Sequence, residues 1–259
     1  MWSLILDNSN KLDGLIKLSE AILTNAILVL NREDYEIKFK SENDAVSSVD
    51  LSLEQMIINF ISRYDPKSPV ISEENLTHYD KAETVWLIDP LDGTSNFIQN
   101  LKPTCISIAK VKKNKVLEAI VIDLSNSDIY LALKGLGAYL NGNRISPKPA
   151  LIKLIGLSTG YFNNNYKIPL GWNARIFGSQ ALHLCYVSKG SLSVSISIEA
   201  KAWDDAAGSL IISESGGHYE NQYPDIDWQT LALNNMSLCS RAIMAKESYD
   251  EIKDLVGIK

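Results

Sequence analysis

The stretch WLIDPLDGTSNF, residues Trp86–Phe97, is the most informative part of the chain. Its first four residues are typical of a buried strand, and Gly93 begins a sequence typical of a helix start. Asp89 and Asp92 lie between the two, on either side of Pro90. Because proline fixes its own φ angle and restricts the preceding residue to extended conformations, this segment is stiff. The stretch therefore predicts a strand that leaves the core directly into two carboxylates of fixed geometry.

Along this segment, side-chain and carbonyl oxygen atoms come first and the backbone N–H groups of a helix start follow. Asp89, the Leu91 carbonyl and Asp92 offer the oxygen ligands that hard divalent cations prefer. The N–H groups of a helix start can receive an anion, and here that start is formed by Gly93, Thr94 and Ser95. Two like charges 4 Å apart cost roughly 4 kcal/mol at an effective dielectric of 20, so carboxylates beside a phosphate need a cation. The order predicts metal-assisted phosphoryl chemistry.

Further carboxylates lie where predicted elements begin or end, which is where α/β proteins build sites. They are Asp50 and Asp204 at helix starts, and Glu73 and Glu74 after the strand in PVISEEN. Each also has a simpler structural interpretation. Asp50 and Asp204 are suitable helix N-caps, the glutamates suit a loop, and Asp92-Gly93 suits a turn.

Hydrophobic periodicity predicts a mixed sequence of helices and strands. Apolar residues at spacings of three and four predict helices, and alternating or continuous apolar runs predict strands. The expected helices are Lys11–Asn31, one that follows Asp50, Gln180–Lys189 and Asp204–Glu214. The expected strands are Val85–Ile88, Thr104–Lys112, Val116–Asp123, Ile129–Leu133, a hairpin in GLGAYLNGNRI, Leu154–Ser158 and Leu192–Ile198.

Chain length indicates one compact unit built from two halves. A chain of 259 residues can remove roughly three quarters of its unfolded surface from water. The pattern weakens around Ser146–Lys153, where Pro147 and Pro149 mark the best boundary. We therefore expect an N-terminal α+β half, residues 1–147, and a C-terminal α/β half, residues 148–259.

Composition excludes several classes of protein. The net charge is −6 with scattered acidic residues, which argues against nucleic acid as the main partner because binding it calls for a basic face. The three cysteines, Cys105, Cys185 and Cys239, form no CxxC pair and are expected as buried residues in a reducing compartment. The start of the chain shows no cationic leader with an apolar core. We expect a cytoplasmic protein without a membrane partner.

Several motifs in register resemble the inositol monophosphatase family. DPLDGTSNF and WDDAAGSLIISESGG are similar to its two signatures, and VSSVD, SEEN and GLGAYLNG are similar to further landmarks in the expected order. The resemblance covers about residues 10–245. It implies the sugar-phosphatase fold, a mixed α+β or α/β architecture layered α/β/α/β/α, and a Mg²⁺-dependent, lithium-sensitive phosphomonoesterase.

The resemblance also implies roles for individual residues around two or three Mg²⁺ ions. One ion would bind Glu74, Asp89 and the Leu91 carbonyl, and a second Asp89, Asp92 and Asp204. Glu73 would lie just outside the ligands. Asp50 and Thr94 would orient and deprotonate the attacking water, and the phosphate would bind the N–H groups of Gly93, Thr94 and Ser95.

The substrate implied by the resemblance is a small phosphorylated polyol or sugar. Ser95-Asn96-Phe97 follows the pattern of inositol and sugar phosphatases, whereas nucleotide-bisphosphate phosphatases have Lys-Glu or Lys-Gly before the phenylalanine. Ser179 and Glu199 occupy substrate-facing positions. The segment from Ser158 to Gly178 departs from the family, because it is short, Asn-rich and without a helical period.

Two alternative functions stay open, together with the question of assembly. One is a 3′(2′),5′-bisphosphate nucleotidase. The other is a regulatory protein that binds RNA or protein, since some bacterial relatives are linked to RNA polymerase and ribosomal RNA processing. The family resemblance also implies a homodimer.

Overall fold

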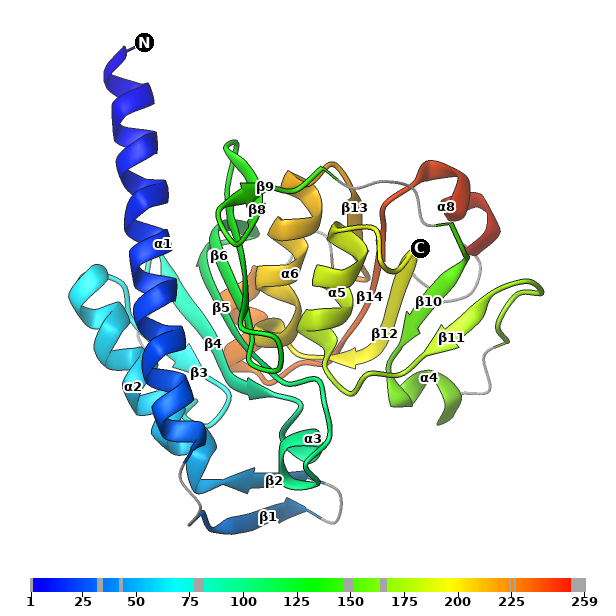
Figure 1. The fold of residues 1–259 in the computed structure, drawn as a ribbon, viewed down its shortest axis with the longest axis horizontal. Helices are drawn as coiled ribbons and strands as arrows, with labels where there is room; N and C mark the ends of the chain where they lie inside the picture. Colours follow the sequence, from blue (N-terminus) through cyan, green and yellow to red (C-terminus); the bar gives the residue numbers. More distant parts are fainter. Residues whose placement is uncertain are drawn as a thin grey trace.

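The computed structural model describes residues 2–31, 35–41, 44–76, 82–146, 151–163, 167–223, 225 and 227–252. The expected boundary between residues 147 and 148 lies outside the described residues. Within them the chain folds into two large mixed sheets with helices before, between and after them (Figure 1).

A seven-stranded sheet forms the centre of the N-terminal half, with the strand order β3-β4-β5-β6-β7-β8-β9. Strand β4 pairs parallel with β3 and antiparallel with β5, and the remaining pairs are antiparallel. The strands are β3 (Val70–Ser72), β4 (Val85–Asp92), β5 (Cys105–Lys112), β6 (Lys115–Asp123), β7 (Asp128–Leu133), β8 (Gly137–Leu140) and β9 (Asn143–Arg144). Strand β4 is thus the strand expected from the sequence, and both aspartates lie at its end.

Helices α1 (Trp2–Leu30) and α2 (Ser48–Tyr64) cover one face of this sheet (Figure 1). Their apolar stripes, with Leu15 and Leu53 among them, pack on Trp86 and Ile88 of β4. The hairpin of β1 (Ile37–Ser41) and β2 (Asp44–Ser47) precedes α2. This packing fixes the start of α2, and with it Asp50, against the end of β4.

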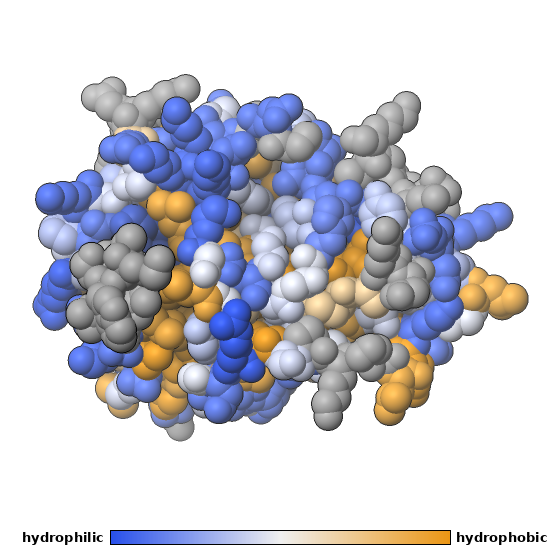
Figure 2. All heavy atoms as spheres, turned by 90° about the horizontal axis from the view of Figure 1, so that it is seen from above, coloured by the Kyte–Doolittle hydropathy of each residue, from blue (hydrophilic) through white to orange (hydrophobic). Residues whose placement is uncertain are grey.

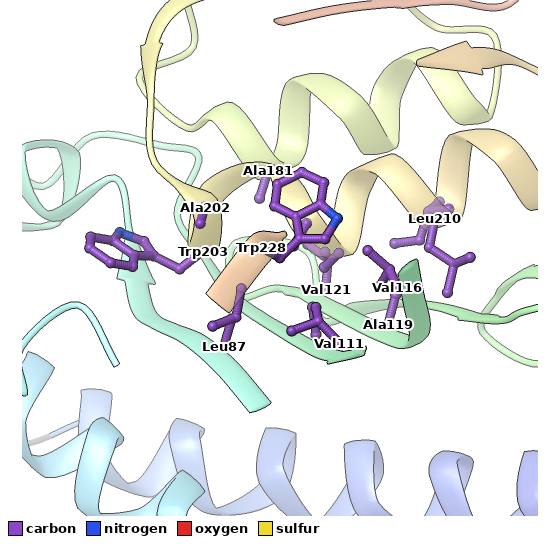
Figure 3. Close-up of a cluster of buried hydrophobic side chains, with 14 of the residues drawn as sticks. Leu87, Val111, Val116, Ala119, Val121, Ala181, Ala202, Trp203, Leu210 and Trp228 are labelled. Atoms are coloured by element: carbon purple, nitrogen blue, oxygen red, sulfur yellow. The ribbon is translucent and has the colours of Figure 1, made fainter. Parts of the chain in front are cut away.

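Helices α5 (Gln180–Ser188), α6 (Ala202–Glu214) and α7 (Trp228–Leu233) cover the opposite face. Figure 3 shows part of the shared core, where sheet residues such as Leu87 and Val121 meet Leu210 of α6 and Trp228 of α7. Because side chains alternate along a strand, Leu87 faces α6 while its neighbours face α1 and α2. Asp89, two residues after Leu87, emerges on the α6 side.

A five-stranded sheet packs on the far side of α5 and α6, with the order β11-β10-β12-β14-β13. Helices α4 (Thr159–Asn163) and α8 (Lys246–Ile252) lie beyond it (Figure 1). The strands are β10 (Leu154–Leu157), β11 (Asn173–Arg175), β12 (Val194–Ala200), β13 (His218–Asn221) and β14 (Leu238–Ile243). The layers run α/β/α/β/α, which confirms the expected fold.

Several elements were not predicted from the sequence, among them those after Gly217: β13, α7, β14 and α8. The hairpin β1–β2, helix α4 and strand β11 lie in segments that were expected to be irregular. Strand β11 pairs in parallel with β10, from Leu154↔Asn173 onward, so its backbone pairing comes from a neighbour distant in sequence. A three-residue strand has too few side chains to show the alternation that predicts strands.

The surface mixes hydrophilic and hydrophobic residues. On the face seen in Figure 2, hydrophilic side chains cover most of the outline, and hydrophobic ones show between them in separate patches. Among the helices in the described ranges, none has the length and apolar character needed to cross a bilayer.

Helices α5 and α6 approach closely at Gly208. A Cβ atom there would lie 2.3 Å from Cδ1 and 2.6 Å from Cβ of Leu184. We expect Gly208→Ala to lower the free energy of unfolding by about 1–3 kcal/mol through overpacking, although alanine favours a helix by about 1 kcal/mol. Urea unfolding measures the change. Gly14→Ala in α1 is the control, because the nearest atom to its added carbon would be a Tyr64 ring carbon at 3.3 Å. Equal stability of both variants would contradict the close packing.

Candidate metal and phosphate site

Three carboxylates from distant parts of the chain converge between the large sheet and α6. One carboxylate oxygen from each of Glu73, Asp89 and Asp204 lies within 4.8 Å of the others. Asp89 is buried, and Glu73 and Asp204 are half-buried. Glu73 follows β3, Asp89 belongs to β4, and Asp204 lies in the first turn of α6. The sequence predicts a convergence of Glu74, Asp89, Asp92 and Asp204. The group observed differs in two members, because Glu73 takes the place of Glu74 and Asp92 is not among the three.

The pairing of β3 with β4 selects Glu73, not Glu74, for this cluster. Ser72 pairs with Ile88, and the Glu73 N–H donates to the Ile88 carbonyl at 3.0 Å. The register thus places Glu73 beside Asp89, and neighbours in register project to the same face of a sheet. The expectation had Glu74 as the ligand and Glu73 outside it. The structure corrects this placement: the half-buried Glu74 is not a member of the cluster found among the described residues.

Asp204 has a structural bond as well as a place in the cluster. Its Oδ2 accepts from the Lys201 N–H at 2.7 Å. Lys201 occupies the N-cap position of α6 and Asp204 the third helical position. The alternative interpretation of Asp204 as the N-cap itself is therefore wrong. The bond holds one oxygen of Asp204, which orients the whole carboxylate toward Asp89.

Asp92 is anchored to the start of α5. Its Oδ2 accepts from the Ser179 hydroxyl at 2.7 Å and from the Ala181 N–H at 2.8 Å. The Cys105 thiol also points at this oxygen, with the sulfur at 3.7 Å. Burial and the charge of Asp92 raise the pKa of Cys105, so the thiol is neutral. Asp92 therefore joins the large sheet to α5 at the edge of the cluster.

The electrostatics of the cluster are unfavourable without a cation. Burial, followed by the charges of Glu73, Asp92 and Asp204, raises the pKa of Asp89 well above its ordinary value. Burial, Asp92 and Glu73 do the same to the pKa of Asp204. A divalent ion would remove this repulsion. The donor set, carboxylate oxygens within one ion's reach, fits Mg²⁺ or a similar hard cation.

The pH dependence of stability tests this repulsion. A raised carboxyl pKa means that the folded chain holds protons which the unfolded chain releases, so stability falls as pH rises above about 4. We expect the free energy of unfolding in EDTA to fall by about 1–3 kcal/mol, relative to that in Mg²⁺, as the pH rises from about 5 to about 8. Urea unfolding in both conditions at each pH measures it. Burial lowers the pKa of His183 to about 4, and this group contributes to both conditions equally. A difference that does not change with pH would contradict the prediction.

Asp50 and Thr94 form a hydrogen-bonded pair just after the end of β4. The Thr94 hydroxyl lies 2.9 Å from Oδ1 of Asp50 and 2.9 Å from the Leu91 carbonyl oxygen. It has one proton and donates to one of them at a time. The other Asp50 oxygen accepts from the Ser47 N–H and hydroxyl. Asp50 is buried and lies at the third position of α2, with Ser47 as the N-cap, so its interpretation as the N-cap is also wrong.

Gly93 creates the start of α3 (Thr94–Ile98). Its φ is +94°, and a Cβ atom would lie 3.0 Å from the Pro103 carbonyl oxygen, so only glycine fits. The first turn of a helix leaves its N–H groups without acceptors in the helix, and Ser95 is exposed. Asn96 fixes the helix, since its amide donates to the carbonyls of Pro103 at 2.8 Å and Phe177 at 2.7 Å.

A cavity of about 210 Å³ begins at Asp92 and Asp204 and extends into the C-terminal half. Ser179 and Glu199, the two predicted substrate-facing residues, both line it. Glu199 is exposed, and Gly160 of α4 approaches it so closely that a Cβ there would lie 2.6 Å from Cδ of Glu199. The structure thus brings both residues to one cavity, although the Ser179 hydroxyl is already engaged by Asp92.

Some members of the site were missed by the sequence analysis. Ser47 had a readable signal, because Ser47-x-x-Asp50 has the spacing of a capping box. Cys105 and Gln180 had none, since their roles depend on partners far along the chain. Asn96 belongs to the quoted motif, but the motif does not reveal its hydrogen bond to the Phe177 carbonyl. Gln180 donates to Oδ1 of the fully buried Asp205 at 2.8 Å, which fixes the residue next to Asp204.

Comparison with known proteins finds similar sequences and structures over most of the chain. A sequence profile of the inositol monophosphatase family matches residues 13–249. The Nus factor SuhB of Escherichia coli is 36% identical over 198 residues, covering 70% of this chain and 73% of SuhB. A fructose-1,6-bisphosphatase/inositol-1-monophosphatase of Thermotoga maritima is 30% identical over 215 residues, covering 80% and 83%. A solved IMPase structure from Thermotoga maritima superposes with a TM-score of 0.77 at 26% identity, covering 94% and 96%.

Proposed function

The chain belongs to the inositol monophosphatase family, and from this premise we propose that it is a Mg²⁺-dependent phosphomonoesterase. Its substrate is inositol monophosphate or a related small polyol or sugar phosphate. The observation that carries the proposal is the convergence of Glu73, Asp89 and Asp204. Thr94 of the Thr94–Asp50 pair lies on the chain segment that follows Asp89, with its hydroxyl 2.9 Å from the Leu91 carbonyl oxygen.

The metal ligands follow from the geometry of the cluster. Glu73, Asp89 and Asp204 would hold divalent cation, with the Leu91 carbonyl and Asp92 available beside them. When bound, Mg²⁺ supplies Lewis acidity that favours deprotonation of water and neutralises phosphate oxygens. Because Asp92 already accepts two hydrogen bonds on Oδ2, its Oδ1 is the oxygen that remains for a cation.

Thr94 and Asp50 would prepare the attacking water. The Thr94 hydroxyl donates its proton to Oδ1 of Asp50 and accepts a hydrogen bond from the water with a lone pair. As the water attacks phosphorus, the ester P–O bond breaks and the alcohol leaves, its oxygen taking a proton from solvent. The proton of the attacking water moves to the Thr94 oxygen, and the Thr94 proton moves to Asp50, which later returns it to solvent. While the Thr94 hydroxyl donates to Asp50, the Leu91 carbonyl oxygen accepts no hydrogen bond from it. Ser47 holds the second Asp50 oxygen and so orients the accepting one.

The remaining groups would bind the ester. The N–H groups at the start of α3, from Gly93 to Ser95, would bind phosphate oxygens. The hydroxyls of a polyol or sugar would extend into the cavity lined by Glu199, whose exposed carboxylate can accept from them. The modest volume of about 210 Å³ favours a small monophosphate.

A phosphate-release screen tests the proposed activity. We expect turnover of inositol monophosphates or of sugar and polyol phosphates in Mg²⁺, with EDTA abolishing it and Li⁺ inhibiting it. Glu199→Gln should raise KM for the preferred substrate by roughly tenfold, because a charged hydrogen-bond partner is replaced by a neutral one. Release of phosphate only from 3′,5′-bisphosphorylated nucleosides, or release that EDTA does not change, would contradict the proposal.

A second candidate function comes from the relative named Nus factor SuhB. A regulatory role of that kind is compatible with this fold, but it does not explain why carboxylates of like charge converge in the interior. In cells that lack the chromosomal copy, a phosphatase-dead variant that restores growth fully would favour the regulatory role.

A further inference from the structure

A second cleft lies on the C-terminal half of α6, away from the carboxylate cluster. Its volume is about 320 Å³, and its walls come from α6, β13, α7 and the turns that flank β6 and β7. It shares no lining residue with the cavity that contains Asp92 and Asp204. Its volume falls within the range of about 300–1,000 Å³ that is usual for small-molecule sites.

Aromatic side chains form one wall of the cleft. Tyr219, Tyr223 and Trp228 all line it. The rings of Tyr219 and Trp228 lie 6.3 Å apart with an angle of 36° between their planes. Aromatic side chains at the border of a cleft favour a planar ring as the ligand, because rings pack on one another with an energy beyond that of area burial.

The aromatic wall is held in place before any ligand binds. The Tyr219 hydroxyl donates to Oδ2 of Asp205 at 2.8 Å, and Trp228 is buried at the start of α7. Asp205 is fully buried, so this hydrogen bond is costly to break. A wall that does not need to be ordered on binding loses little affinity to conformational entropy.

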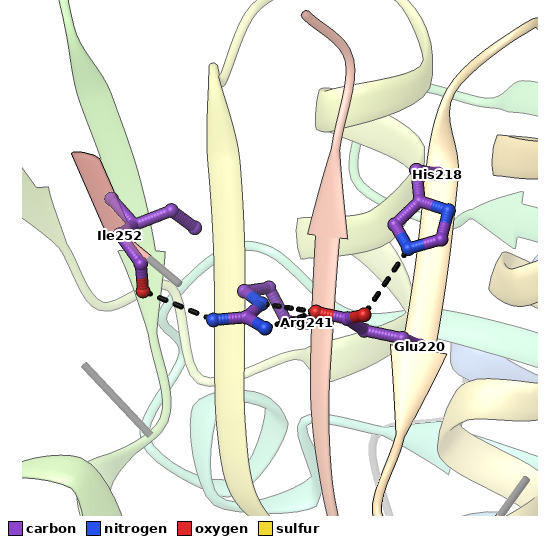
Figure 4. A network of polar contacts seen from close by, with 4 residues as sticks. All are labelled: His218, Glu220, Arg241 and Ile252. Carbon is purple, nitrogen blue, oxygen red and sulfur yellow. Dashed lines mark hydrogen bonds and ion pairs between the residues drawn. The ribbon is translucent and has the colours of Figure 1, made fainter. Parts of the chain in front are cut away.

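The charged groups of the cleft favour an anion. Lys115 and Lys134 line it and are exposed, and neither forms an ion pair with a residue in the described ranges. Among the lining residues that the structure describes, Glu220 is the one acidic residue. Its carboxylate is bound by the buried Arg241, with Nε at 2.6 Å (Figure 4). The carboxylate is therefore compensated, and the two lysines set the charge of the cleft.

We propose that this cleft is a second small-molecule site, for a ligand that carries a planar aromatic ring and a phosphate or carboxylate group. The ring packs against Tyr219 and Tyr223, which are backed by the core that contains Trp228, and the anionic group pairs with Lys115 and Lys134. The site is distinct from the carboxylate cluster and needs no metal.

Direct binding tests the proposal. Adenosine 5′-monophosphate is the probe, and isothermal titration is done in EDTA so that the carboxylate cluster cannot bind its phosphate through a metal. We expect binding in the millimolar range or tighter. Ribose 5-phosphate, which lacks the ring, and adenosine, which lacks the anion, should each bind at least roughly tenfold more weakly.

Matched variants locate the binding. Lys115→Ala combined with Lys134→Ala should weaken binding at least roughly tenfold. Lys17→Ala, an exposed lysine of α1 on the other side of the large sheet, should leave it unchanged. Asp204→Asn should also leave it unchanged. Naphthoate, an aromatic carboxylate, distinguishes the anion: tighter binding than adenosine 5′-monophosphate assigns the site to carboxylates, and weaker binding to phosphates.

Three results would overturn the proposal: no measurable binding of either aromatic anion, equal binding of ribose 5-phosphate, or full affinity in the double lysine variant. Because the titration uses no metal and no turnover, its failure leaves the proposed phosphatase activity untouched. A negative phosphatase screen, in turn, does not contradict the proposed ligand site.

Discussion

Asp89→Asn is expected to reduce kcat/KM for phosphate release by at least roughly a thousandfold, which corresponds to about 4 kcal/mol. Asp89 is the buried member of the cluster, and the neutral amide of asparagine is a poor ligand for a hard cation. Phosphate-release assays across a range of Mg²⁺ concentrations measure the loss, and excess Mg²⁺ should not restore the rate.

The same substitution should stabilise the metal-free protein. Burial and three neighbouring carboxylates raise the pKa of Asp89, so replacing its charge removes repulsion. We expect the free energy of unfolding in EDTA at neutral pH to rise by about 1–3 kcal/mol. Asp13→Asn, at an exposed position of α1, is the matched control and should change neither quantity. An Asp89→Asn protein that is both inactive and less stable in EDTA would indicate simple misfolding and contradict the electrostatic account.

Thr94→Val is expected to reduce kcat by roughly a hundredfold, because it removes the hydroxyl through which a proton would reach Asp50. Valine keeps the shape of threonine without its oxygen. Oδ1 of the buried Asp50 would lose a donor, which should also cost about 1–3 kcal/mol of stability. Steady-state kinetics and urea unfolding measure the two effects.

The control for Thr94→Val is Thr94→Ser, which keeps the hydroxyl. We expect Thr94→Ser to retain activity within roughly tenfold and to keep the stability that valine loses. Mn²⁺ affinity should be nearly the same in both variants, because the hydroxyl is hydrogen-bonded to Asp50 or Leu91 and the three carboxylates of the cluster are unchanged. Equal kcat values for the valine and serine variants would show that the hydroxyl plays no part in the reaction.

The sequence predicted the site where local features were sufficient. The run from Trp86 to Phe97 contains its own strand, proline and glycine, and the structure places these as expected in β4 and α3. Gly93 has the positive φ angle that a helix start at this point requires. The family resemblance, which the comparison confirms, correctly indicated the layered fold.

The sequence failed where a side chain's direction depends on a distant strand. Glu73 and Glu74 are adjacent acids of one type, and only the pairing of Ser72 with Ile88 decides which of them meets Asp89. A change of register by one residue would exchange the two. The second cleft could not be predicted from the sequence either, because Lys115, Tyr219 and Trp228 come together only when α6 and α7 pack on the sheet.

The metal affinity of Glu73→Gln and Glu74→Gln tests the central claim most directly. Mn²⁺, whose binding is followed by electron paramagnetic resonance, reports on the cluster without any turnover. We predict that Glu73→Gln weakens Mn²⁺ binding at least roughly tenfold, or about 1.4 kcal/mol, and that Glu74→Gln retains nearly the affinity of the unsubstituted chain. Unchanged affinity in Glu73→Gln, with the loss appearing in Glu74→Gln instead, would contradict the arrangement of carboxylates described above.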